Sequence, residues 1–203
     1  VGVWNSATDK NAFWTFQEVA EDQFSSTTTY YWPATPGKYE IITLPVSVDW
    51  VMDGTPYGVA GVTADNQLAL VELDEIPAGT PFIHLANETF TNPKYGAAFN
   101  LVFGGDGEAL PHNIEYVTEP VVTECLTGTL CEVDTVPAGY AYFNNGNVAA
   151  TKNTVIGANS GFIGVIGQAM PVADAAMADE MIDLGKVVID EINEANVVVL
   201  PAI

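Results

Sequence analysis

The sequence predicts an all-β protein, either an antiparallel β-sandwich or a partly open barrel. Short runs rich in β-branched and aromatic residues recur roughly every ten residues, and turn-forming residues separate them. The chain contains 18 glycines and 12 prolines, which suit tight turns better than long helices. No alternation of strands with helical segments is visible, so a parallel α/β sheet is not expected.

A turn-plus-strand unit is repeated in the sequence. Residues 75–83 read E-I-P-A-G-T-P-F-I and residues 135–143 read T-V-P-A-G-Y-A-Y-F, while residues 156–163 (I-G-A-N-S-G-F-I) form a weaker echo without the proline. Proline presets φ of one turn residue and glycine permits a positive φ, so each unit predicts a tight turn that leads into a strand. We expect these two related turn-strand units to occupy equivalent positions, with Phe82 and Tyr142 as corresponding residues.

The remaining elements are predicted in chain order. An alternating strand at residues 12–19 precedes residues 25–36, a segment rich in Ser, Thr and Pro that reads as a loop or linker. Hairpins are expected at Asp65-Asn66 and, most clearly, at Asn145-Gly146, which favours a type I′ turn. Residues 173–184 fit a helix or a strand. Further strands are predicted at residues 39–48 (interrupted by Pro45), 57–63, 67–73, 81–85, 99–103, 113–117, 121–124, 128–133, 141–143, 148–151 and 160–166.

This pattern divides the chain into three parts. Residues 1–36 are expected to be the end of a preceding β module plus a linker, and residues 37–185 a β-sandwich-like domain. Residues 186–203 are expected to form a C-terminal strand or tail.

The charge excludes several classes of partner. Five basic residues stand against 26 acidic ones, for a formal net charge of −21. Such a chain has no basic footprint for nucleic acid or for an anionic membrane surface. No apolar run approaches the roughly 20 residues that span a bilayer, so no membrane span is expected. The acidity fits solubility outside the cell.

Catalytic and metal-binding patterns are weak. His84 and His112 are the only histidines, and neither lies near other ligands at a metal-binding spacing. Glu72 and Asp74 share one face of a predicted strand, where solvated carboxylates explain them better than a glycosidase pair. The loop at residues 104–108 offers only Asp106 and Glu108 to calcium and does not match an EF-hand. We therefore expect no enzyme activity, no cofactor and no structural metal.

Aromatic residues give the best candidate for a binding site. Trp4, Tyr30, Tyr31 and Trp32 could stack on the apolar faces of sugars, or they could pack between neighbouring modules. Trp14 and Trp50 are expected in the core, which is the usual place of strand aromatics.

Cys125 and Cys131 are separated by five residues, which matches neither a redox CxxC motif nor a zinc set. They could form a local disulfide, or they could be two small apolar residues that point the same way along one strand. The sequence leaves both alternatives open.

The order of several motifs resembles a known class of domain. Residues 39–46 (Y-E-I-I-T-L-P-V), residues 75–83, Leu126-Thr127-Gly128-Thr129 and residues 135–143 follow one another as "TLYLPF", "IPANTPVIL", "LxGT" and "VPAGxAY" do in that class. Such domains occur near the C-terminal end of large secreted or surface-displayed proteins of Bacteroidales-type bacteria. The resemblance covers roughly residues 39–185, and residues 4–19 are similar to the closing strands of a lectin-type trefoil. The two cysteines depart from the pattern, as does His84, where an aliphatic residue is expected.

The resemblance implies an extracellular or cell-surface location and a mostly structural role, with no catalytic residues to transfer. Together with the residue patterns, it predicts a non-catalytic structural or accessory domain that contacts neighbouring modules of the same polypeptide. The alternative is a module that binds carbohydrate or a host surface.

Overall fold

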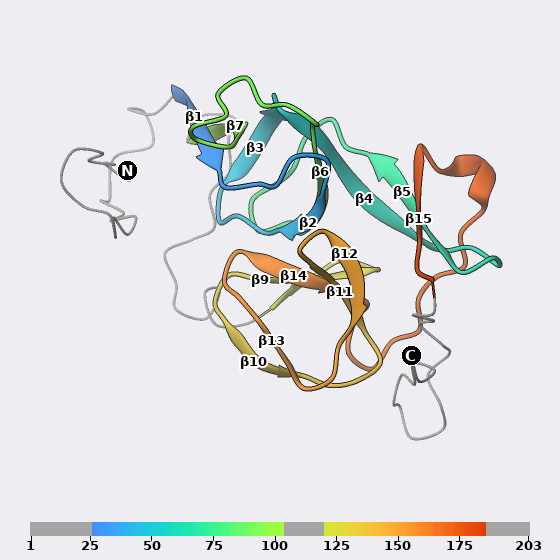
Figure 1. The fold of residues 1–203 in the computed structure, drawn as a ribbon. Helices are drawn as coiled ribbons and strands as arrows, with labels where there is room; N and C mark the ends of the chain where they lie inside the picture. Colours follow the sequence, from blue (N-terminus) through green and yellow to red (C-terminus); the bar gives the residue numbers. More distant parts are fainter. Residues whose placement is uncertain (1–25, 104–119, 186–203) are drawn as a thin grey trace.

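The computed structural model describes residues 26–103 and 120–185, and the regular secondary structure of these residues is almost entirely β-strand (Figure 1). The predicted all-β fold is confirmed, because every pairing between the named strands is antiparallel. The predicted strands at residues 12–19 and 113–117 lie outside the described residues. The elements are β1 (Ser26–Trp32), β2 (Tyr39–Ile42), β3 (Ser47–Val51), β4 (Gly54–Val62), β5 (Gln67–Glu72), β6 (Phe82–Ala86), β7 (Ala97–Phe103), β8 (Val121–Val122), β9 (Leu126–Thr129), β10 (Val133–Val136), β11 (Ala141–Asn144), β12 (Asn147–Ala150), β13 (Thr154–Ile156), β14 (Ser160–Ile163), the 3-10 helix η2 (Ala175–Met177) and β15 (Glu180–Asp183).

The strands form three sheets and one small ribbon. The first five-stranded sheet has the order β15-β5-β4-β6-β2, and the second has the order β12-β11-β14-β9-β8. A three-stranded sheet has the order β1-β7-β3, while β10 and β13 pair as a separate ribbon. In Figure 1, β2 lies between the three-stranded sheet and the second five-stranded sheet.

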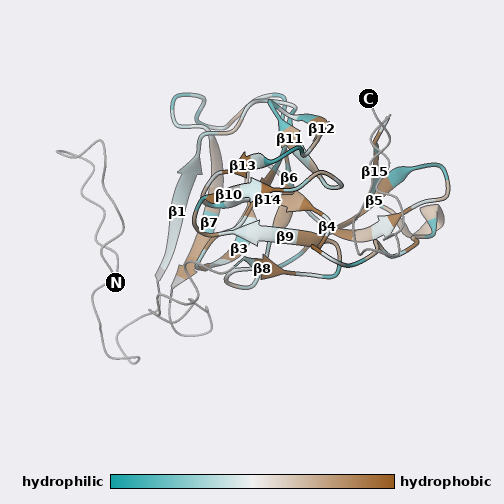
Figure 2. Cartoon of the chain, turned by 90° about the horizontal axis from the view of Figure 1, so that it is seen from below, coloured by the Kyte–Doolittle hydropathy of each residue, from teal (hydrophilic) through white to brown (hydrophobic). Residues whose placement is uncertain are grey.

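Strands β2 and β6 form a central layer that is buried on both faces. Adjacent strand residues point to opposite faces. Ile41 and Ile83 therefore pack in a hydrophobic cluster with the second five-stranded sheet, whereas Ile42 and Phe82 pack in another cluster with β3 and β7. Figure 2 shows the outer position of β1, which is pale, while its partner β7 carries hydrophobic colour.

The predicted hairpins are confirmed. Asn66 has φ 59° in the turn between β4 and β5. Asn145 and Gly146 have φ 49° and 77° in the turn between β11 and β12, as a type I′ turn requires.

Both Pro-Ala-Gly segments are tight turns that lead into strands, as predicted. In the first turn, Gly79 has φ 76° and the Thr80 N–H donates to the Pro77 carbonyl over 3.1 Å. In the second turn, Gly139 has φ 114°, and the Thr151 hydroxyl accepts from the Tyr140 N–H and donates to the Pro137 carbonyl. The following strands are β6 and β11.

A larger duplication underlies these turns. We name residues 39–86 the N-terminal repeat and the equivalent residues 124–166 the C-terminal repeat. In each repeat, an early and a late segment of the chain are joined by two antiparallel residue pairs. From the first pair to the second, the position on each segment shifts by six residues. The pairs are Ile42–Phe82 and Val48–Ile76 in the N-terminal repeat, and Thr127–Phe162 and Val133–Ile156 in the C-terminal repeat.

These residue pairs show that the two Pro-Ala-Gly segments do not occupy equivalent positions in the two repeats. The structural counterpart of the first Pro-Ala-Gly turn is the weaker echo, where Asn159 takes the positive φ, 55°, that Gly79 takes in the N-terminal repeat. Phe82 therefore corresponds to Phe162, and not to Tyr142 as expected from the sequence. The second Pro-Ala-Gly turn belongs to an insertion that carries the β11–β12 hairpin.

The two repeats interlock where β2 ends. The Thr43 N–H donates to the Asn159 carbonyl over 3.3 Å, and the Thr43 hydroxyl donates to the Ser160 carbonyl over 2.7 Å. Gly128 faces this point so closely that a Cβ there would overlap Thr43 and lie 2.9 Å from the Pro81 Cβ. Only glycine fits at this approach.

The segment after β14 returns to the first sheet. The Ala173 N–H donates to the Val62 carbonyl over 3.0 Å, and the Asp179 N–H donates to the Leu70 carbonyl over 2.9 Å. Strand β15 then pairs with β5, so the ambiguous residues 173–184 contain a 3-10 turn followed by a strand.

Two further sequence expectations are wrong. The segment at residues 25–36, expected to be a linker, contains β1, which pairs with β7 from Ser26–Phe103 to Trp32–Ala97. Its Thr and Tyr residues have high β propensity, and they outweigh the loop-like flanks. Trp50, expected in the core, is 49% exposed, because the register of β3 shifts between Val48 and Trp50 and redirects the side chain.

Candidate functional site

A polar pocket of about 270 Å³ lies where the two repeats meet. One wall comes from the end of β1, the following loop and β2, and the other from the β11–β12 hairpin and the turn before β14. Its aromatic lining residues are Trp32, Tyr39 and Phe143, and its polar ones are Thr35, Lys38, Glu40, Asn145, Asn159 and Ser160.

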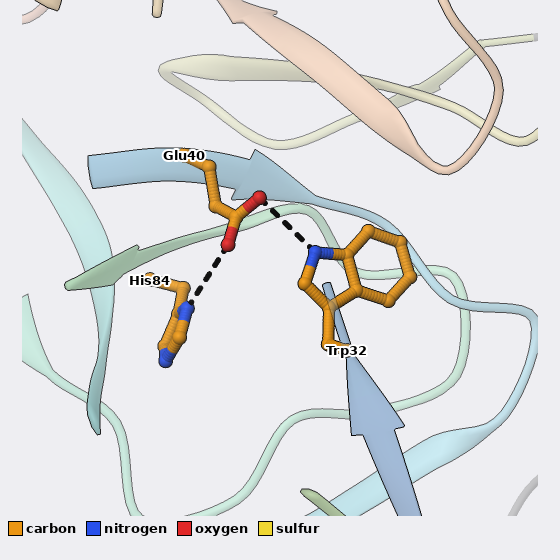
Figure 3. A network of polar contacts seen from close by, with 3 residues as sticks. All are labelled: Trp32, Glu40 and His84. Carbon is orange, nitrogen blue, oxygen red and sulfur yellow. Dashed lines mark hydrogen bonds and ion pairs between the residues drawn. The ribbon is translucent and has the colours of Figure 1, made fainter. Parts of the chain in front are cut away.

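Glu40 is the one carboxylate among the described residues that line this pocket, and Figure 3 shows its polar contacts. Its Oε2 accepts from the Trp32 indole Nε1–H over 3.0 Å, and its Oε1 lies 3.4 Å from His84 Nδ1. A hydrogen bond between these two atoms requires a proton on His84 Nδ1 when the Glu40 carboxylate is ionised. The Glu40 side chain is 30% exposed, whereas that of His84 is fully buried.

The strand pairing explains why these three side chains meet. Glu40 and His84 are directly opposite each other on β2 and β6, so they share one face of the sheet. This face is turned toward Phe99 on β7, whose ring lies 5.1 Å from the His84 ring in an edge-to-face contact. Trp32, at the end of β1, contacts the same Phe99 ring at 6.4 Å.

His84 is a fully buried polar side chain with one ring nitrogen that has no hydrogen-bond partner. Its Nε2 is buried without a hydrogen-bond partner, and a Cβ on Gly54 would overlap that atom. A buried, unpartnered nitrogen is costly, so the Glu40 contact and the Phe99 packing must hold the ring in place. The full burial keeps His84 away from any ligand in the pocket, and it serves to orient Glu40.

The aromatic wall spans both repeats. The Tyr39 ring stacks on the Phe143 ring at 5.7 Å with planes 21° apart. Burial raises the pKa of Tyr39, and the nearby Glu180 carboxylate adds to this effect. Gly146 of the neighbouring hairpin is so close to the Lys38 side chain that a Cβ there would lie 2.5 Å from the Lys38 Cβ. These contacts fix the walls of the pocket relative to each other.

The structure places Tyr30 and Trp32 on one face of β1, with their ring centroids 6.2 Å apart, and Tyr31 on the opposite face. Trp32 lines the pocket. Tyr30 packs against the cluster at β3 and β7, and its burial raises the pKa of its hydroxyl. Tyr31 points to the opposite face of β1, where its ring lies 5.5 Å from that of exposed Tyr95. Trp4 lies outside the described residues.

Of the pocket residues, sequence reasoning predicted only Trp32 as a site residue, and among those that it missed are Tyr39, Glu40 and Phe143. A signal for Glu40 exists, because it is the one charged residue in the apolar run Y-E-I-I. No sequence pattern indicates that β2 meets the β11–β12 hairpin, since that contact joins segments about a hundred residues apart.

The other candidates stay apart. Asp74 and Glu72 are exposed, as solvated carboxylates would be, and the Glu72 N–H donates to Asp179 Oδ2 over 2.9 Å. His112 and the loop at residues 104–108 lie outside the described residues. Within residues 26–103 and 120–185, no group of three or more metal-ligating side chains comes together.

Cys125 and Cys131 are free thiols in the structure. Strand β9 lies between them, and its four extended residues at about 3.3 Å each keep the cysteines beyond the roughly 7 Å that a disulfide allows between Cα atoms. Burial raises the pKa of Cys125 to about 11, and the Glu124 carboxylate adds to the shift.

Comparison of the chain with protein-family models, with curated protein sequences and with solved structures found no match. Over its described residues, the chain forms no helix with the length and hydrophobicity that a bilayer span requires.

Proposed function

We propose that this chain is a non-catalytic structural domain of a secreted or cell-surface modular protein, placed in line between neighbouring modules. The observation that carries the proposal is the position of the two outermost strands. β1 and β15 lie at opposite sides of the body in both Figure 1 and Figure 2. The chain therefore enters the described body at one side and leaves it at the other.

Both outer strands are tied to the body along their length. β1 pairs with β7 over seven residue pairs, and β15 pairs with β5 over four. Between them, the two repeats interlock at Thr43 and Gly128. A body connected in this way holds its two ends at a fixed separation, which is the property that a spacer needs.

The chemistry of the pocket supports a non-catalytic role. Glycoside hydrolysis requires two carboxyl groups that face each other across the sugar. Among the described residues that line the pocket, Glu40 is the single carboxylate; its Oε2 already accepts from the Trp32 indole, and its Oε1 lies 3.4 Å from His84 Nδ1. The charge of −21 supports a location outside the cell, where strong acidity favours solubility.

The spacer role can be tested by joining a small folded reporter domain to each end of the full chain. Small-angle X-ray scattering is expected to give one narrow distribution of the distance between the reporters. A Gly/Ser linker of the same length between the same reporters serves as the control and is expected to give a broad distribution. An equally broad distribution for this chain would contradict the spacer role.

The non-catalytic character is tested separately, by a screen of the full chain against glycoside, ester and peptide substrates. We expect no turnover. Turnover that disappears in Glu40→Gln, with an unchanged melting temperature, would show that the chain is an enzyme.

A further inference from the structure

We infer that the pocket between the two repeats binds a neutral sugar residue, with Glu40 as the hydrogen-bond acceptor that orients it. This inference does not depend on the spacer role, because a spacer needs no ligand. It rests on the combination of aromatic, amide and carboxylate groups in one pocket.

The lining matches the two kinds of surface that a sugar presents. The C–H faces of a pyranose ring pack against aromatic side chains, which Trp32, Tyr39 and Phe143 supply. The hydroxyl groups of a sugar need donors and acceptors close by. These are supplied by Asn145 in the β11–β12 turn, Asn159 in the turn before β14 and Ser160 at the start of β14, which all line the pocket.

Glu40 can accept further hydrogen bonds from the hydroxyl groups of a ligand. Each carboxylate oxygen has about two acceptor sites, so one protein donor on each oxygen leaves further lone pairs available. The Trp32 and His84 donors hold the carboxylate in one orientation, and its 30% exposure keeps it accessible to a ligand. Hydrogen bonds from a hydroxyl group to a carboxylate are roughly twice as strong as neutral ones.

The size and charge of the pocket narrow the ligand class. A volume of about 270 Å³ lies just below the range of about 300–1,000 Å³ that is typical for drug-sized ligands, so it suits one or two sugar rings. Lys38 is the only basic residue among those that line the pocket, and Glu40 balances its charge. A protein of net charge −21 also repels anions. Neutral sugars are therefore expected to bind better than uronic or sialic acids.

A substitution at the rim can block the pocket without removing any contact. Ala158 lines the pocket and is exposed in the turn before β14, next to Asn159 with its positive φ. Ala158→Phe would place a ring in the pocket. Ala64→Phe is the matched control, because Ala64 is also exposed in a tight turn that ends in a positive-φ asparagine, Asn66, and it does not line the pocket.

The experiment screens the full chain by saturation-transfer NMR against glucose, galactose, mannose, N-acetylglucosamine and their short oligomers, with glucuronic and sialic acid as anionic probes. Tryptophan fluorescence titration then gives the affinity for each sugar that binds. We expect at least one neutral sugar to bind at millimolar or lower concentration, more tightly than either acid.

Ala158→Phe is expected to weaken that binding at least tenfold, and Ala64→Phe to change it less than twofold, with both variants melting near the parent temperature. Glu40→Gln is expected to weaken binding about tenfold, because the charged acceptor is lost while the side-chain shape is kept. If no neutral sugar binds at a concentration of about 20 mM, which would detect even millimolar affinity, the proposal is overturned. Equal affinity of Ala158→Phe and the parent chain would also overturn it.

Discussion

The N-terminal repeat and the C-terminal repeat share one scheme of strand pairing but differ in the hairpin that lies between the paired segments. Both contain two antiparallel pairs six positions apart and a positive-φ residue three positions after the inner pair. Between these fixed points, the N-terminal repeat contains the long β4–β5 hairpin, whereas the C-terminal repeat contains the short β11–β12 hairpin. The shared pairing therefore fixes the positions of only a few residues, and the length of the hairpin between them can differ.

The clearest chemical difference lies at one pair of equivalent positions. In the N-terminal repeat, Glu40 and His84 extend the strand pair and carry the polar contact of the pocket. In the C-terminal repeat, the same place holds Cys125 and Gly164, whose backbones are joined by a 2.7 Å hydrogen bond. The carboxylate of Glu40 in one repeat therefore stands at the position of the buried Cys125 thiol in the other, and only Glu40 lines the pocket.

The largest expected effect comes from the contact that locks the repeats together. In Gly128→Val, the new side chain would occupy the space of Thr43 and Pro81, so the free energy of unfolding should fall by about 3 kcal/mol or more. Urea denaturation followed by tryptophan fluorescence measures the loss. Gly157→Ala is the control, because nothing lies within 4 Å of its Cβ position, and it should change stability by less than about 1 kcal/mol. A fully stable Gly128→Val would show that the repeats do not interlock at this point.

The next effect separates the two Pro-Ala-Gly turns. Thr151→Val keeps the side-chain shape but removes the hydroxyl that bridges Pro137 and Tyr140, so it should cost about 2 kcal/mol. The first turn is closed by the backbone N–H of Thr80, so Thr80→Val should cost less than about 0.5 kcal/mol. Thermal or urea unfolding of both variants tests this difference, and equal losses would contradict it.

A smaller, pH-dependent effect reports on the buried thiol of the C-terminal repeat. Burial raises the pKa of Cys125 from 9.0 to about 11. The unfolded chain therefore loses its thiol proton at lower pH than the folded chain does, and stability falls as pH rises from 9 toward 11. Between pH 8 and pH 10, the loss from this group should be about 1.4 kcal/mol.

Urea denaturation at the two pH values, with Cys125→Ala as the control, tests this expectation. The alanine variant should show a correspondingly smaller fall. Burial also raises the pKa of Tyr39 and Tyr57, and these groups lower stability in the same direction above pH 10 in both proteins. An identical pH dependence in the two proteins would show that Cys125 ionises normally when the chain is folded.

The smallest effect compares the equivalent positive-φ positions. Gly79→Ala should cost about 1 kcal/mol, because a Cβ disfavours the φ of 76°. Asn159→Gly should change stability by less than about 0.5 kcal/mol, because glycine adopts the φ of 55° readily. Calorimetric melting of both variants is the measurement, and a larger loss in Asn159→Gly would mean that the asparagine side chain has its own role in the turn.

Local features of this fold could be predicted from sequence, and long-range ones could not. Asn145-Gly146 and the Pro-Ala-Gly segments determine their turns through backbone preferences that act over four residues. The register of β1 against β7 depends on side chains some seventy residues apart, as in the bond between Thr29 and Asn100. No period or motif in the sequence reports on such a pairing.

The same limit applies to the site. Trp32 was predicted because exposed aromatic clusters suggest binding. Tyr30 packs beside it but does not line the pocket, and Tyr31 lies on the opposite face of β1. Glu40 was missed because its partner His84 is 44 residues away, and their contact exists only once β2 and β6 have paired.

The return of β15 to the first sheet has a consequence for how the chain matures. Glu72 and Asp179, which are joined by a hydrogen bond, lie 107 residues apart, and Thr43 and Ser160 lie 117 apart. A nascent chain emerging from its N-terminus exposes the edge of β5 long before β15 has been made to cover it. Uncovered strand edges recruit other chains, and contacts of such long range form slowly. The part of the chain that is made before β15 is also strongly acidic, so mutual repulsion would keep these incomplete chains apart until β15 has been made.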